Sequence, residues 1–234
     1  MYSTKELTEM GFGNLLQQAD MVTLAVLALL LLMSVLSWFI MLSKALRAAA
    51  IRARAGHVVS RFWEAASDED AMAFLRKQSG SEPFSRIALD CADAAAKHEQ
   101  HRNRLRSALT VTEFVERSLR HAVTRENARL EGGLILLATV GSTAPFVGLF
   151  GTVWGIYHAL VRLGASAEAS LDAVAAPVGE ALIMTAIGLA VAVPAVLGYN
   201  LLVRSNRLIA AQFDAFAHDL YQFFATGARS AQAA

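Results

Sequence analysis

Three long apolar runs constrain this 234-residue chain more than any other feature of its sequence. The first extends from Met21 to Ser43 and the second from Gly132 to Val161, and neither contains an Asp, Glu, Lys or Arg. The third extends from Ala173 to Val203 and contains a single charge. A helix needs about 20 apolar residues, at a rise of roughly 1.5 Å each, to cross a bilayer. Because lipid offers the backbone no hydrogen-bond partners, we expect these runs to form three transmembrane helices.

The composition agrees with a membrane protein and argues against an enzyme. Charged residues make up 18% of the chain, compared with about 25% in a typical soluble domain. The sequence has no phosphate-binding loop, dinucleotide fingerprint or zinc-protease motif. It also has no basic patch interleaved with aromatic residues. We therefore expect a non-enzymatic protein without a cofactor, surrounded by membrane lipid and not bound to nucleic acid.

The apolar runs divide the chain into seven segments, and we expect an all-α integral membrane protein. Between the first two runs lies a polar segment that contains 16 of the 21 Lys and Arg residues. Its apolar residues recur with helical spacing, which predicts amphipathic helices with a solvated charged face. Gly80 and Pro83 predict a break between them, whereas the sequence from Ser85 to Glu131 allows a helix continuous with the second run. The predicted segments are 1–20, helix 21–43, a helical domain at 44–131, helix 132–161, a loop at 162–172, helix 173–203 and a tail at 204–234.

The distribution of Lys and Arg predicts the orientation of these helices. Basic residues follow the first run closely, among them Lys44 and Arg47, and Arg204 and Arg207 follow the third. The first 20 residues contain one Lys and three acids. Because short cytoplasmic loops are enriched in Lys and Arg, we expect the large polar domain and the C-terminus in the cytoplasm. The N-terminus and the loop at 162–172 are then expected on the periplasmic side.

Glu180 is the only charged residue in the third run. A carboxylate at the centre of a membrane helix costs about 2.5–3.5 kcal/mol on insertion scales, so acids are rare there and mostly functional. The alternative is a structural one, in which Glu180 bonds a neighbouring helix or reaches the membrane surface. The functional interpretation makes Glu180 part of a pathway through a helix bundle.

Small residues and two threonines accompany this acid. At helical rise, Thr152 lies about 15 Å below Arg162, while Glu180 and Thr185 lie about 12 Å and about 20 Å below Asp172. Glu180 and Thr185 are separated by about 140° around the helix, so they cannot share one face. Strips of small residues more often form packing seams than pores. Such strips occur in the second and third apolar runs, and they contain Pro145, Gly148, Gly155 and Gly188.

The histidines and the single cysteine give weaker indications of function. His158, near the expected outer end of the second helix, could relay protons or serve as a polar anchor. His98 and His101 have a spacing that permits metal binding, but no further ligands cluster near them, so we expect no metal site. Cys91 is the only cysteine, which excludes an internal disulfide, and we expect it to be a small packing residue.

Two dense motifs in the later helices carry a family resemblance. They are APFVGLFGTVWGI at 144–156 and GEALIMTAIGL at 179–189, and Val193-Pro194-Ala195 and Tyr199-Asn200 follow. Together they resemble the ExbB/TolQ group of proton-channel proteins, over about residues 132–204. Residues 157–160 and 216–220 resemble the ExbB branch more than the TolQ branch. The flagellar protein MotA is a more distant relative, and this chain lacks its fourth span.

The resemblance implies a function that spacing alone does not supply. ExbB-like proteins form a pentameric inner-membrane ring whose second and third spans line a pore. Single-span ExbD helices occupy that pore and bring a protonatable Asp. The complex energises TonB for transport of iron chelates and vitamin B12 across the outer membrane. By this resemblance Thr152 and Thr185 are pore-facing hydroxyls and Glu180 is the acidic pore residue. A TolQ-like role in envelope integrity, through TolR and TolA, and a purely structural assembly subunit are the alternatives.

The orientation leads to a first prediction. A topology reporter fused at Ala169 should be read as periplasmic, and one fused at Gly80 as cytoplasmic, because the basic residues follow the first and third runs. Paired alkaline phosphatase and fluorescent-protein fusions at both sites provide the measurement. The reverse pattern would show that the positive-inside rule assigns the wrong orientation to this chain.

Overall fold

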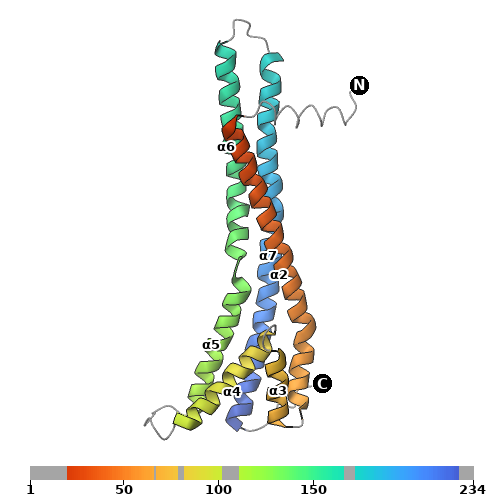
Figure 1. Ribbon diagram of the computed structural model, residues 1–234, viewed down its shortest axis with the longest axis vertical. Coiled ribbons are helices and arrows are strands. Elements are labelled where there is room, and N and C mark those ends of the chain that lie inside the picture. The colour runs from red at the N-terminus through yellow and green to blue at the C-terminus, as the bar shows by residue number, and fades with distance from the viewer. Residues whose placement is uncertain (1–19, 66, 79–81, 102–110, 166–171, 227–234) are drawn as a thin grey trace. The chain divides into compact units, whose positions relative to one another are not determined.

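The computed structural model describes residues 20–65, 67–78, 82–101, 111–165 and 172–226. Every regular element in these ranges is a helix (Figure 1). The expectation of an all-helical chain is therefore confirmed for the described residues. The helices are α2 (Met21–Glu64), α3 (Asp68–Gln78), α4 (Pro83–His101), α5 (Val111–Glu131), α6 (Leu134–Ala165) and α7 (Asp172–Thr226).

Among the described residues, three helical regions contain a stretch long and apolar enough to cross a membrane, as the sequence predicts. These stretches lie within Met21–Glu64, Thr112–Gly164 and Pro177–Phe224, and the second region has a break at Gly132 and Gly133. Large apolar side chains stay exposed along them, such as Leu31 at 65%, Phe146 at 70% and Leu201 at 69%. Exposure of this kind fits contact with lipid or with other chains and does not fit contact with water.

The described chain divides into two compact units, to which α2 and α7 each contribute residues. Unit 1 comprises Met1–Leu42 and Gly133–Leu201, and unit 2 comprises Ser43–Gly132 and Leu202–Ala234. In unit 1 the first part of α2 packs with α6 and with the first part of α7 (Figure 1). The small core of unit 1 contains Val26, Leu30, Val140, Ala144, Met184, Val191, Ala192 and Ala195.

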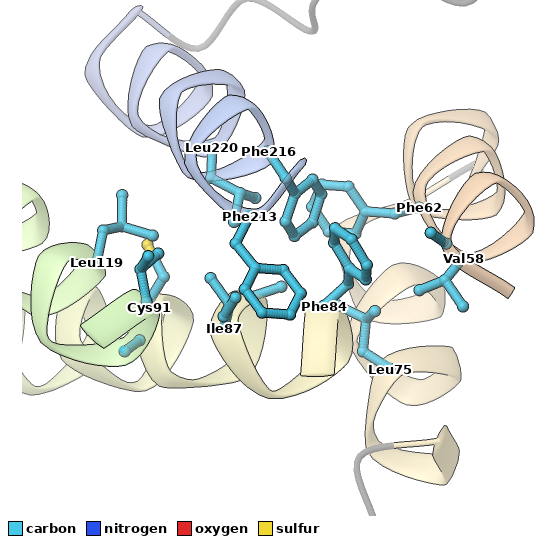
Figure 2. Packing of buried hydrophobic residues seen from close by; sticks show 14 of the residues in the cluster. Val58, Phe62, Leu75, Phe84, Ile87, Cys91, Leu119, Phe213, Phe216 and Leu220 are labelled. Carbon is cyan, nitrogen blue, oxygen red and sulfur yellow. The ribbon is translucent and has the colours of Figure 1, made fainter. Parts of the chain in front are cut away.

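Unit 2 has a larger core, rich in aromatic side chains (Figure 2). Phe84 at the start of α4 makes edge-to-face contacts with Phe213 and Phe216 of α7, at ring-centroid distances of 4.9 and 5.6 Å. Pairs of this geometry stabilise a core beyond the area that they bury. Cys91 lies fully buried in this core, and burial raises the pKa of its thiol to about 12. The prediction that Cys91 is a packing residue is therefore confirmed.

Local capping explains where the shorter helices begin. The Ser67 hydroxyl accepts from the Asp70 N–H at 3.1 Å, and the Asp70 carboxylate accepts from that hydroxyl at 2.8 Å. This reciprocal pair caps α3. The next helix begins with Pro83 at its first position, which needs no N–H donor. Since α3 ends at Gln78 and α4 begins at Pro83, the predicted break between helices is present.

The helix continuous with the second apolar run, which the sequence allows, is not formed, because α5 ends at Glu131 and α6 begins at Leu134. Gly133 adopts a φ of 85°, in the left-handed region that glycine adopts without steric cost. The last carbonyl groups of α5 are satisfied by side chains. Lys44 Nζ donates to the Arg129 and Leu130 oxygens at 3.1 and 3.3 Å, and Asn206 Nδ2 donates to the Leu130 oxygen at 2.9 Å.

The expectation that charges of the polar domain line a solvated helix face is wrong for two acids. Glu126 is 4% exposed and accepts two hydrogen bonds from the Arg86 guanidinium, at 2.6 and 2.9 Å. Glu82 is 2% exposed, and its Oε2 accepts from the Phe84 N–H at 2.8 Å, while its Oε1 has no hydrogen-bond partner among the described residues. Burial raises the pKa of Glu82 above its usual value, and this effect outweighs the backbone hydrogen bonds and the nearby arginines.

The buried carboxyl of Glu82 predicts a pH dependence of stability. A raised pKa in the folded state means that the folded chain binds this proton more tightly than the unfolded chain does. The stability of the wild type relative to Glu82→Gln should therefore increase as the pH falls from 8 through the raised pKa of Glu82. Thermal unfolding in detergent across this range provides the measurement. Glu116→Gln, at an exposed side chain, is the control and should show no such trend. Parallel pH curves for wild type and Glu82→Gln would contradict the prediction.

Candidate functional site

The backbones of α6 and α7 approach closely in unit 1 because glycines lie at their contact. A Cβ atom built on Gly148 would lie 2.6 Å from the Met184 carbonyl oxygen and 3.0 Å from the Gly188 Cα. One built on Gly188 would lie 2.7 Å from the Ala144 carbonyl oxygen. No side chain fits at such distances, so the glycine pair sets the separation of the two helices.

The two other members of the predicted strip occupy different surroundings. A Cβ atom on Gly155 would lie 2.8 Å from the Ala181 Cβ, so this residue also belongs to the contact between α6 and α7. Pro145 lies within α6, which continues past it without a break from Leu134 to Ala165. The structure thus places three of the four predicted packing residues directly between the two helices.

The contact between α6 and α7 brings the two threonines together. Thr152 is 6% exposed, and its Oγ1 hydrogen-bonds the Oγ1 of Thr185, with either hydroxyl able to donate. The same Thr152 oxygen lies 3.0 Å from the Ala181 carbonyl oxygen and 3.2 Å from that of Gly148. A hydroxyl has one proton, so only one of these acceptors can receive it at a time. The pair can therefore switch partners without moving its heavy atoms.

Glu180 lies on another side of α7, as its angular offset from Thr185 predicts. It is half-buried and lines a cavity of about 80 Å³ together with Pro177, Ala181 and Met184 of its own helix. The described residues provide no hydrogen bond or ion pair to its carboxylate. An acid in an apolar helix without a partner among the described residues is suited to exchange a proton with water or with another chain.

The other wall of this cavity contains a cluster that the sequence did not predict. Asp20 precedes α2, and its Oδ1 accepts from the Met21 N–H at 2.9 Å. Its Oδ2 lies 3.3 Å from Trp154 Nε1, which donates to it, and 3.9 Å from His158 Nε2. An Asp immediately before an apolar helix is a common N-terminal cap, and this signal could have singled out Asp20. Its contact with α6 depends on tertiary packing.

The described residues contain no group of three or more His, Cys, Asp and Glu side chains arranged to hold a metal ion. The side chains of His98 and His101 lie outside those described. The cavity therefore combines carboxylates, an imidazole and an arginine, Arg162, without a metal-like arrangement among them. Such groups can accept, hold and pass on protons.

Residues 86–215 match the sequence profile of the MotA/TolQ/ExbB proton channel family. The matched region covers more than half of the chain and contains Thr152, Glu180 and Thr185. The chain belongs to this family, and the resemblance seen in its motifs is confirmed.

Individual relatives place the chain closer to one branch of the family. It is 50% identical to the biopolymer transport protein ExbB of Xanthomonas campestris, an alignment that covers 95% of this chain and 92% of that protein. It is 37% identical to ExbB of Neisseria meningitidis, covering 91% of this chain and 96% of that protein. The Tol-Pal system protein TolQ of Pseudomonas aeruginosa is 35% identical, covering 88% of this chain and 89% of that protein. The preference for ExbB over TolQ is therefore confirmed.

The glycine contact leads to a prediction about assembly of the helices. Gly148→Ala should destabilise the chain by about 1–3 kcal/mol, because its methyl group would force α6 away from the Met184 carbonyl. Gly179→Ala is a matched control in the same unit, since a Cβ atom there meets nothing within 4 Å. Thermal unfolding of both variants in detergent provides the comparison. Equal losses in the two variants would show that helix separation does not depend on Gly148.

Proposed function

We propose that this chain is the proton-channel subunit of an inner-membrane motor. This motor couples the proton motive force to TonB-dependent transport of iron chelates and vitamin B12 across the outer membrane. The observation that carries the proposal is the pair of hydroxyls on Thr152 and Thr185, together with Glu180, the one acid of the third apolar run, which is half-buried and unpartnered among the described residues. Membership of a proton-channel family and the identity to proteins named ExbB support it.

The assembly follows from what a single chain lacks. Three apolar helices from one chain can hardly enclose a pathway, and their large exposed side chains need lipid or other subunits. We therefore propose a homo-pentamer in which α6 and α7 line a pore. One acid per chain is a poor relay by itself, so a single-span ExbD-like partner supplies a second protonatable group within the pore. A TonB-like protein then receives the energy, at about 2.3 kcal/mol per charge for each 100 mV.

The predicted seven segments and their orientation belong to the same proposal. The N-terminus and residues 162–172 face the periplasm, and residues 44–131 and 204–234 lie in the cytoplasm. In this arrangement Gly148, Gly155 and Gly188, with Pro145, pack the wall of the pore. The protein then acts without a cofactor and without covalent catalysis, because its work is proton transfer and conformational coupling.

A TolQ-like role is the second candidate, and the 35% identity to TolQ of Pseudomonas aeruginosa is the observation that favours it. The two roles differ in the partner that they need. Copurification from native membranes should yield an ExbD-like single-span protein for the TonB-coupled role and a TolR-like one for the envelope role.

The proposed pathway predicts a graded set of variants. Glu180→Ala should abolish TonB-dependent uptake while the protein still inserts and assembles. Thr152→Val and Thr185→Val each keep the shape of the side chain and remove its hydroxyl, so either should cause a mild loss, because water can bridge one gap. The double variant should lose most uptake. Uptake of vitamin B12 or an iron chelate by cells that lack their own copy of the chain provides the measurement.

A matched control is available on the same helix. Thr143 is exposed, and its hydroxyl bonds only within α6, to the Thr139 carbonyl at 2.7 Å. Thr143→Val should therefore retain full uptake at a normal membrane level. Full uptake in the double variant of Thr152 and Thr185 would show that those hydroxyls only fill space. Full uptake in Glu180→Ala would favour the structural assembly role.

A further inference from the structure

The groups around His158 of α6 select one tautomer of its neutral imidazole. Its Nδ1 lies 3.1 Å from the Trp154 carbonyl oxygen. A carbonyl oxygen can only accept, so Nδ1 bears the hydrogen. In the neutral ring Nε2 then has a free lone pair, and it faces the Asp20 carboxylate at 3.9 Å. The one position at which this imidazole can gain a proton is directed towards a negative charge.

The indole of Trp154 lies against the imidazole and also holds the acid. The indole of Trp154 lies 4.6 Å from the imidazole, centroid to centroid, close enough for its π face to attract a cation. The same indole donates its N–H to Asp20 Oδ2 at 3.3 Å, which orients the carboxylate. Tyr157 lies 5.3 Å from the imidazole, centroid to centroid, with the two rings nearly perpendicular.

The pair opens onto the cavity that contains the acid of α7. Asp20, His158 and Glu180 line the same space of about 80 Å³, which has room for more than one water molecule. Among the described residues that line this cavity with the imidazole, the ionisable side chains are Asp20 before α2, Arg162 on α6 and Glu180 on α7. Two carboxyl groups and one guanidinium thus line the same space as the imidazole.

We propose that Asp20 and His158 form a proton-capture site at the entrance of the pathway to Glu180, on the side of the membrane that residues 162–172 face. This inference rests on the proposed function and deepens it by adding two residues upstream of the acid. A hydronium ion gives its proton to His158 Nε2 and leaves as water, and Asp20 stabilises the imidazolium. The proton then passes through water in the cavity to the Glu180 carboxylate, which restores the neutral imidazole. No bond other than those to this proton changes.

The test compares variants that keep shape but cannot perform the capture step. His158→Asn keeps a donor for the Trp154 carbonyl but cannot bind a proton, and Asp20→Asn keeps an acceptor for the Trp154 indole but loses the charge. Uptake of vitamin B12 should be near normal for both at an external pH of about 5.5. It should fall several-fold below the wild type at about pH 8, where protons are scarce and capture limits the rate. Tyr157→Phe, next to the same ring, is the control and should follow the wild type at every pH.

A loss of uptake independent of external pH, or uptake like the wild type in both variants, would overturn the proposal. If Glu180→Ala abolishes uptake while these variants do not alter it, the capture site fails and the proposed function stands. If Glu180→Ala is silent, the proposed function fails, and the capture site fails with it.

Discussion

The approach of α6 to α7 at Gly148 and Gly188 is the constraint on which the candidate site depends. Lipid provides no hydrophobic force that drives one apolar helix against another, so packing and interhelical hydrogen bonds must hold them together. The glycine pair permits that packing at backbone distance. Thr152 follows Gly148 by about one helical turn, and Thr185 precedes Gly188 by about the same interval. The hydroxyl pair is therefore a direct product of the glycine pair.

Unit 2 is stabilised in a different way. Its core resembles that of a water-soluble protein, with edge-to-face contacts between Phe84 and two phenylalanines of α7 and a buried ion pair between Arg86 and Glu126. A buried pair of this kind contributes little net stability, but removal of one partner leaves an uncompensated charge. The glycine contact of unit 1 and the aromatic core of unit 2 thus suit their proposed surroundings, lipid and water.

Much of the architecture could be predicted because it depends on patterns within one segment. Charge-free runs of sufficient length predict the apolar helices, and the offset between Glu180 and Thr185 predicts that they face different ways. Contacts between distant segments leave no such pattern. Asp20 lies 134 residues before Trp154, and nothing local indicates that they meet. In the sequence Glu82 is indistinguishable from a surface charge. In the structure it is buried, and it accepts a hydrogen bond from the Phe84 N–H. The break at Gly133 does have a local signal, because Gly132 and Gly133 form a Gly-Gly pair of the kind that marks turns.

The burial of Cys91 makes this chain convenient for chemical probing. A thiol reacts as its thiolate, and a pKa of about 12 keeps this one protonated throughout the range in which labelling reagents are used. It is also the only cysteine in the sequence. A cysteine introduced at an accessible position would thus be the sole reactive thiol in an otherwise unchanged chain. Spin labels, fluorophores and crosslinkers could be attached one site at a time, without first replacing a native residue in the core.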